Sequence, residues 1–137
     1  MAAVPGLFLP RMATVSVGRD VAAPPAAAWD VLTSTRFWPM WGPSVLAVDP
    51  ADARIGPGST GRVRTAVGVW LSFAVTDWHE GRSWSWRVAG LPATGHRVEP
   101  TADGCRVSFD VPAVAAPYLL VCRIALGRIA RLALEAR

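Results

Sequence analysis

The C-terminal segment, residues 118–137, places the strongest constraint on how this chain can fold. Its apolar residues recur at steps of three and four, at Leu119, Cys122, Leu126, Ile129 and Ala133. This period is that of an amphipathic α-helix, and at about 1.5 Å per residue the helix extends roughly 30 Å. Such a helix has to bury its apolar face, and a sheet of comparable length would cover it.

The middle of the chain has the pattern of antiparallel strands. Short segments rich in β-branched and aromatic residues alternate with turn residues, at 45–49, 62–67, 70–79, 83–88, 95–100 and 104–111. The pair Asp103-Gly104 is typical of a tight hairpin turn. In 83–88, Trp84, Trp86 and Val88 alternate with polar residues, which predicts a half-buried strand with two stacked tryptophans facing inward.

The N-terminal third is predicted to hold one strand and two short helices. Residues 14–21 alternate and end before Pro24 and Pro25, which suit the first turn of a helix that continues to Leu32. Residues 33–41 carry four large apolar side chains around Pro39, which favours a second, short helix. Residues 1–12 are interpreted as a flexible tail and residues 13–137 as a single domain.

The composition favours a cavity. The chain is 52% hydrophobic and only 18% charged, with seven tryptophans among its 137 residues. Polar surface is therefore scarce relative to apolar surface. Part of the apolar surplus is expected to line an internal pocket rather than a solid core.

Several classes of function are disfavoured. The net charge of +4 comes from scattered arginines, so we expect no nucleic-acid partner. Cys105 and Cys122 lie in apolar runs without metal-ligand spacing, which indicates buried thiols in a reducing cytoplasm. Arg123, Arg128 and Arg131 interrupt the longest apolar run, so no stable membrane insertion is expected. No metal, nucleotide or other cofactor motif occurs, and we expect no cofactor.

Four segments in order resemble one known family. They are residues 22–33 (AAPPAAAWDVLT), 37–45 (FWPMWGPSV), 56–63 (GPGSTGRV) and 96–109 (HRVEPTADGCRVSF). Together they resemble the START-related ligand-binding superfamily (SRPBCC) and, within it, the polyketide cyclase/dehydrase and lipid-transport family. The resemblance implies an α+β helix-grip fold. In this fold a curved antiparallel sheet of about seven strands wraps around a long C-terminal helix, two short helices follow strand 1, and a ligand cavity lies between sheet and helix.

His96 is the candidate catalytic residue. The family pattern implies that its strand face looks toward the cavity, where a neutral imidazole can donate to a ligand carbonyl or transfer a proton. The alternative is a structural histidine hydrogen-bonded at the sheet edge. His79, beside Glu80, is expected to be exposed.

The candidate ligand-binding residues are mostly apolar and aromatic. They are Trp38, Trp41, Phe73, Val75, Trp84, Trp86, Val98, Phe109, Tyr118, Cys122 and Leu126. Trp38 and Trp41 are interpreted as a lid over the pocket or as a brace between helix and sheet. Both faces of 70–79 carry apolar groups, so the pattern does not decide which face is buried. The resemblance implies that Phe73 and Val75 face inward. Tyr118 is expected either to place its hydroxyl at the pocket mouth or to pack.

Three functions remain open. The first is a cytoplasmic carrier or sensor of a small hydrophobic molecule that is aromatic, polyketide-like or acyl in character. The second is a polyketide aromatase, cyclase or dehydrase that uses the same cavity. The third is a membrane-surface or partner-binding module in which the arginine-bearing C-terminal helix lies on lipid or protein. A homodimer is compatible with each.

Overall fold

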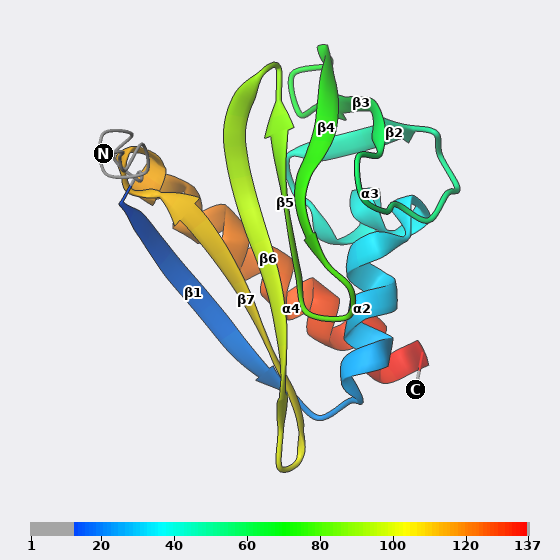
Figure 1. Ribbon diagram of the computed structural model, residues 1–137, viewed down its shortest axis with the longest axis vertical. Coiled ribbons are helices and arrows are strands. Elements are labelled where there is room, and N and C mark those ends of the chain that lie inside the picture. Colours follow the sequence, from blue (N-terminus) through cyan, green and yellow to red (C-terminus); the bar gives the residue numbers. More distant parts are fainter. Residues whose placement is uncertain (1–12, 137) are drawn as a thin grey trace, which may run out of the picture.

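The computed structural model describes residues 13–136, which form a curved antiparallel sheet with helices on one face (Figure 1). The sheet has seven strands in the order β1-β7-β6-β5-β4-β3-β2. Its strands are β1 (Thr14–Val21), β2 (Val45–Asp49), β3 (Thr60–Thr65), β4 (Trp70–His79), β5 (Ser83–Val88), β6 (Leu91–Thr101) and β7 (Gly104–Pro112). The predicted helix-grip fold is confirmed. The tail predicted for residues 1–12 lies outside the described residues.

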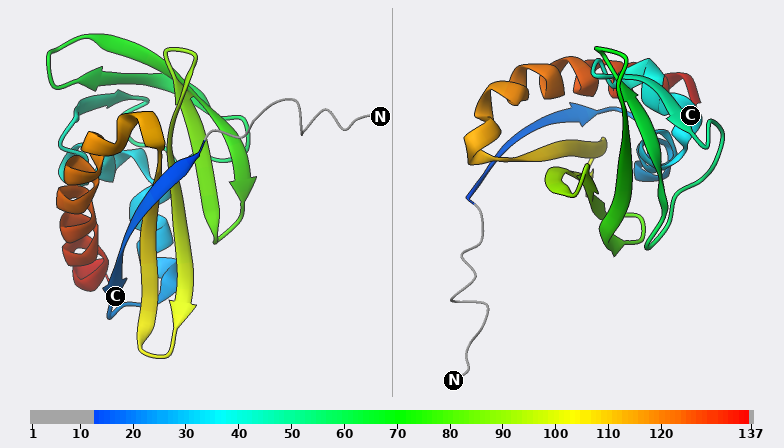
Figure 2. Two further views of the ribbon diagram at one scale, coloured as in Figure 1. Left: turned by 90° about the vertical axis from the view of Figure 1, so that its left-hand side faces the viewer. Right: turned by 90° about the horizontal axis from the view of Figure 1, so that it is seen from above.

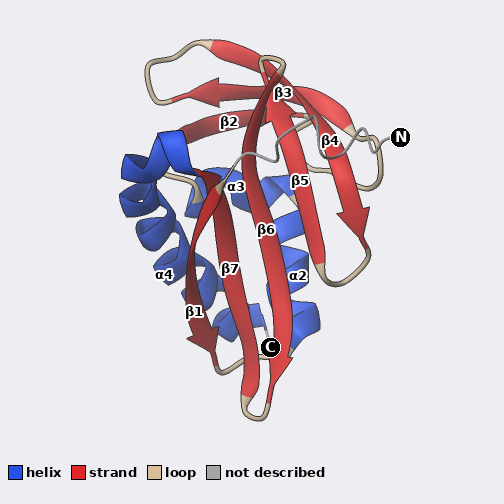
Figure 3. Cartoon of the chain, turned by 60° about the vertical axis from the view of Figure 1, so that its left-hand side comes forward, coloured by secondary structure: helices blue, strands red, loops and turns tan. Residues whose placement is uncertain are grey.

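The helices lie together against the concave face of the sheet (Figures 2 and 3). The helical elements are α2 (Pro25–Thr33), η1 (Thr35–Phe37), α3 (Trp38–Trp41), η2 (Ala113–Tyr118) and α4 (Leu119–Ala136), of which η1 and η2 are 3₁₀ turns. Pro25 begins α2, as expected from its missing N–H. Contacts from α4 reach β1, β7, α2 and α3, so the long helix closes the open side of the curved sheet.

Several element boundaries differ from the prediction, and β3 lies at Thr60–Thr65 instead of 62–67. The second short helix is a 3₁₀ turn followed by one α-helical turn, because Pro39 lies in its first turn and supplies no N–H. The long helix starts at Leu119, after a 3₁₀ segment that contains Pro117. Strand β6 begins at Leu91 instead of residue 95. Ala89 and Gly90 both have positive φ and form a tight turn that brings Leu91 opposite Val88.

The core lies between the sheet and α4. On α4, Cys122, Leu126, Ile129 and Ala133 are buried, as the period of the sequence predicts. Both cysteines are buried and free, as predicted. Phe73 and Val75 are buried, so β4 turns the expected face inward, and a bulge between Val75 and Asp77 lies just beyond them. His79 is exposed, as expected.

The hairpin between β6 and β7 depends on a glycine. Gly104 pairs with Thr101 where the chain turns, as the Asp103-Gly104 pair predicts. A Cβ atom at Gly104 would lie 2.2 Å from the Val21 carbonyl oxygen and 3.0 Å from the Ala23 amide nitrogen. Both neighbours are backbone atoms, so they cannot move aside as a side chain could.

We therefore expect Gly104→Ala to lower the free energy of unfolding by at least ~1–3 kcal/mol, the usual cost of overpacking a tight site. Gly56→Ala is the matched control, because nothing lies within 4 Å of its added Cβ. Urea denaturation followed by circular dichroism measures both variants. Equal stability of the two proteins would show that the β6–β7 hairpin tolerates a side chain.

Candidate functional site

Two tryptophans tie α3 to the end of α2. The indole Nε1–H of Trp38 donates to the carbonyl oxygen of Leu32 at 3.0 Å, and that of Trp41 donates to Val31 at 3.0 Å. These carbonyls belong to the last turn of α2, where backbone acceptors have no partner within the helix. Trp38 is 1% exposed and Trp41 is 6% exposed. The structure therefore places both rings in the interior as a brace between helix and sheet, and not as a lid.

The aromatic side chains converge on His96. His96 lies opposite Trp84 on β5 and opposite Phe109 on β7. Its ring centroid lies 3.9 Å from the Trp84 ring, in a stacked arrangement, and 4.9 Å from the Phe109 ring, edge to face. Trp41 completes the enclosure at 6.3 Å. The imidazole is therefore surrounded by apolar rings on the concave face of the sheet.

The predicted stacking of Trp84 on Trp86 is wrong. Their rings meet edge to face at 5.5 Å and 77°, whereas Trp84 stacks on Trp38 at 5.6 Å and 11°. Trp38 also contacts the edge of Trp86 at 5.3 Å. The register of β5 against β6 shifts between Ser85 and Arg87, which places Trp86 at an irregularity in the strand pair. Trp38 from α3 thus occupies the stacking position on Trp84 that was expected for Trp86.

A chain of hydrogen bonds fixes the tautomer of His96. The Nδ1 atom lies 3.2 Å from the carbonyl oxygen of Trp84, which can only accept, so Nδ1 carries the proton. Nε2 therefore accepts from the Thr94 hydroxyl at 2.9 Å, and the Thr94 oxygen accepts from the indole of Trp86 at 3.0 Å. Both ring nitrogens are occupied. His96 is thus hydrogen-bonded, as the structural alternative expects, but it lies inside the sheet and not at its edge, because β6 lies between β5 and β7.

Burial keeps the imidazole of His96 neutral. The residue is 1% exposed, and desolvation lowers its pKa from 6.5 to about 4 against smaller opposing effects of the Trp84 carbonyl and the Asp110 charge. At neutral pH His96 is therefore a hydrogen-bonding group without charge. Proton transfer at Nε2 would require the Thr94 hydroxyl to turn away first.

Two adjacent cavities open beside this cluster, between the sheet and the start of α4. The inner cavity measures about 40 Å³ and the outer cleft about 290 Å³. Five residues line both of them: Ser44, Val45, Trp86, Thr94 and Tyr118. The His96 ring forms part of the inner wall.

The mouth lies where the loop before β2 approaches η2. The hydroxyls of Ser44 and Tyr118 are 2.5 Å apart and form a hydrogen bond across it. Tyr118 is 36% exposed, so its phenol reaches both the cavity and solvent. Of the two interpretations for Tyr118, the structure supports the one that places its hydroxyl at the pocket mouth.

The structure separates the sequence candidates into two groups. One group lines the inner cavity: Trp38, Trp41, Trp86, His96, Phe109, Tyr118 and Cys122. The other group lines neither cavity: Phe73, Val75, Trp84, Val98 and Leu126. Trp38 packs on Phe73 at 5.4 Å and on Trp84, which fills that space. Val98 on β6 is 1% exposed and Leu126 on α4 is 2% exposed. Both elements also contact α2, so these two side chains belong to the packed core and not to the cavity wall.

Sequence reasoning identified Tyr118 but missed the serine and threonine hydroxyls and the small apolar residues of the outer cleft. The missed residues include Ser44, Val63, Thr65, Val88, Ala93, Thr94, Val111 and Ala115. Thr94 shares the inward face with His96, two residues on, and this alternation could have revealed it. Thr65 likewise shares its strand face with the buried Val63, two residues before it. Its hydroxyl is buried and has no hydrogen-bond partner among residues 13–136.

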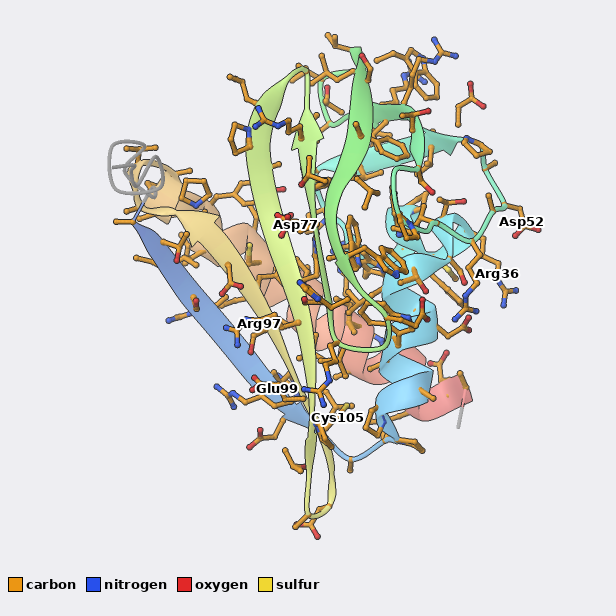
Figure 4. The ribbon with its side chains drawn as sticks, in the orientation of Figure 1. Arg36, Asp52, Asp77, Arg97, Glu99 and Cys105 are labelled. Atoms are coloured by element: carbon orange, nitrogen blue, oxygen red, sulfur yellow. The ribbon has the colours of Figure 1, made fainter. Side chains whose placement is uncertain are left out.

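The charged side chains lie elsewhere. Among residues 13–136, no aspartate, glutamate or arginine lines the inner cavity or the outer cleft. Arg97 instead donates to both oxygens of Asp110, at 2.8 and 2.9 Å, on the face of the sheet opposite the helices, where Asp77 also lies (Figure 4). In the described part of the chain, no group of three or more metal-ligating side chains gathers.

The lowered pKa of His96 gives a testable dependence of stability on pH. Between pH 6.5 and about 4 the unfolded chain binds a proton at this position and the folded chain does not. The free energy of unfolding should therefore decrease as the pH falls through this window, by up to ~3 kcal/mol. His96→Gln should remove this contribution, whereas His79→Gln, at an exposed site, should keep it. Identical pH profiles for the wild type and His96→Gln would contradict the assignment.

Comparisons with known proteins agree with this architecture. The family described as polyketide cyclase/dehydrase and lipid transport matches residues 12–136. The protein MLL2253 from Mesorhizobium loti has a TM-score of 0.72 at 16% identity, over 91% of this chain and 99% of its own. CV1439 from Chromobacterium violaceum has a TM-score of 0.64 at 19% identity, over 88% and 96%.

DynU16, a protein from the dynemicin biosynthetic locus, has a TM-score of 0.65 at 20% identity. The similarity covers 89% of this chain and 47% of DynU16. No curated protein matches significantly. At these identities the solved structures establish the shared fold, and the family match covers all of the described residues. The chain therefore belongs to the polyketide cyclase/dehydrase and lipid transport family.

Proposed function

We propose that this protein is a carrier or sensor that binds a small, uncharged hydrophobic molecule in the outer cleft. The observation that carries the proposal is the composition of the cleft wall. The cleft of about 290 Å³ is lined by apolar side chains and four hydroxyl-bearing residues, and no charged side chain of the described residues contributes to its wall. An ionised ligand buried there would lose its hydration without gaining a counter-charge, so a neutral ligand is favoured.

The wall also indicates the character of the ligand. Ser44, Thr65, Thr94 and Tyr118 present hydroxyls, and that of Thr65 has no partner among the described residues. A ligand with a carbonyl or hydroxyl group could satisfy it, while the Trp86 ring offers an aromatic surface. The volume is at the small end of the usual range for ligand sites, roughly 300–1,000 Å³. We therefore favour a compact aromatic, polyketide-like or acyl ligand, as the family description and the DynU16 locus also suggest.

Filling the cleft tests the proposal. Ala115 lines the cleft, whereas the nearby Ala113 is exposed and does not. Ala115→Trp should lower the affinity for the neutral fluorescent probe N-phenylnaphthylamine at least about tenfold through steric exclusion, a loss of ~1.4 kcal/mol. Ala113→Trp is the matched control and should bind like the wild type. Fluorescence titration measures all three proteins.

The charge of the ligand can be tested with the same scaffold. Anilinonaphthalene sulfonate adds a negative charge to this probe, and it should bind the cleft more weakly than the neutral form. Native mass spectrometry of freshly purified protein would then identify any retained small molecule. Equal binding of the neutral probe by Ala115→Trp, Ala113→Trp and the wild type would overturn the proposed site.

One observation favours polyketide cyclase or dehydrase activity as a second candidate. The neutral imidazole of His96 forms part of the inner cavity wall. If His96 exchanges a proton with the substrate, His96→Gln should abolish turnover of a linear poly-β-ketone. Thr94→Val should retain it, because this change releases Nε2. Unchanged turnover in His96→Gln would eliminate the catalytic role of this residue.

We also propose that the protein works in the cytoplasm. Cys105 and Cys122 are both buried as free thiols, which suits a reducing cytoplasm. No cofactor or nucleic-acid partner is proposed.

A further inference from the structure

The outward face of α4 is unusually apolar for a helix that covers a core. Leu120 is 66% exposed, Ile124 is 50% exposed and Leu134 is 37% exposed. With 3.6 residues per turn, these three side chains fall on one stripe of the helix. Val114, in the preceding turn, is 87% exposed and extends the apolar surface toward the cleft. We call Val114, Leu120, Ile124 and Leu134 the outer stripe.

Arginines accompany the outer stripe. Arg123 and Arg131 are exposed and Arg128 is half-buried, and all three project from the outward half of α4. None of them forms an ion pair within residues 13–136. Glu135 is the one acidic residue in α4. The face therefore combines apolar side chains with positive charge that has little opposing charge nearby.

The opposite face of α4 is fixed in the core. By length and composition the segment Ala113–Ala136 is apolar enough to cross a membrane, and 28% of its most apolar window is buried. Cys122, Leu126 and Ile129 are nevertheless packed between the helix and the sheet. Only the outward face is available, so the helix can lie along a surface while the domain stays folded.

The chemistry of the outer stripe points to one kind of partner. A nucleic acid would leave the exposed leucine and isoleucine side chains without apolar contacts. A second copy of the chain, related by a two-fold axis, would bring two sets of the same three arginines together. An anionic bilayer satisfies both components, because leucine and isoleucine enter the acyl boundary while arginines reach the phosphates.

The position of the outer stripe connects it to the cleft. Val114 adjoins Ala115, which lines the cleft, and Tyr118 at the mouth lies two residues before Leu120. We propose that the outward face of α4 docks on an anionic lipid surface and thereby holds the mouth of the cleft beside the bilayer. This inference rests on the proposed function: docking would let the apolar ligand pass between the cleft and the membrane without crossing water.

Vesicle flotation tests the docking. Wild-type protein should float with vesicles of phosphatidylcholine and phosphatidylserine, and much less with phosphatidylcholine alone. Arg123→Gln and Arg131→Gln should each weaken binding about fivefold, the ~1 kcal/mol expected for one basic residue at an anionic surface. Leu120→Ser with Ile124→Ser should also reduce flotation, through lost apolar burial. The controls are Arg82→Gln and Val67→Ser, which change exposed residues away from α4.

The outcomes separate docking from ligand binding. The α4 variants should bind N-phenylnaphthylamine in vesicle-free buffer like the wild type, because none of the changed residues lines the cleft. Absence of wild-type flotation, or equal flotation of all variants, would overturn the docking proposal while leaving the cleft proposal standing. If the protein dimerises without lipid and Leu120→Ser abolishes the dimer, this face belongs to a second copy of the chain. That result would also overturn the docking proposal.

Discussion

The site depends on two indole hydrogen bonds from α3 to the last turn of α2. Trp38 and Trp41 satisfy carbonyl oxygens that the helix itself leaves unpaired, and in doing so their rings are held over the sheet. Trp38 then fills the space above Phe73 and Trp84, while Trp41 packs against Phe109 and lies near His96. Where these two rings end, the gap between sheet and α4 stays open as the inner cavity.

The same packing explains why the few polar groups in the interior are uncharged. Aromatic rings surround His96, and its burial keeps its pKa low. Within residues 13–136 its ring nitrogens form hydrogen bonds with Thr94 and with the Trp84 carbonyl. Buried polar groups that are fully hydrogen-bonded cost little, whereas a buried ion without a partner costs much more. Charged pairs such as Arg97 and Asp110 are consequently found on the opposite face of the sheet. The cavity wall that remains is suited to neutral ligands.

The helix α4 has two apolar faces with different roles. Its inner face, with Cys122 and Ile129, closes the core, and its outer face presents Leu120 and Ile124 to the surroundings. The cleft mouth lies at the N-terminal end of this helix, where Tyr118 contacts Ser44. One element thus connects the core, the proposed ligand site and the surface that we assign to lipid.

The sequence by itself determined the features that depend on local periodicity. Four local signals predicted four elements. The three- and four-residue steps of residues 118–137 predicted the long helix, and the alternation around Trp84 predicted a half-buried strand. The paired prolines predicted the start of the first helix, and Asp103-Gly104 predicted the final hairpin. The four family segments predicted how these elements are joined. These signals act between neighbouring residues, so they can be read without knowing the rest of the fold.

Only the tertiary structure decided which aromatic side chains fill space and which leave it open. Trp38 stacks on Trp84 from 46 positions away in the sequence, and that contact removed Phe73 and Trp84 from the cavity wall. The hydrogen bonds of the His96 nitrogens likewise depend on residues brought together by several strands, and so does the Thr65 hydroxyl, which has no partner among the described residues. Side chains from distant segments compete for one volume, and periodicity along the chain does not record the result of that competition.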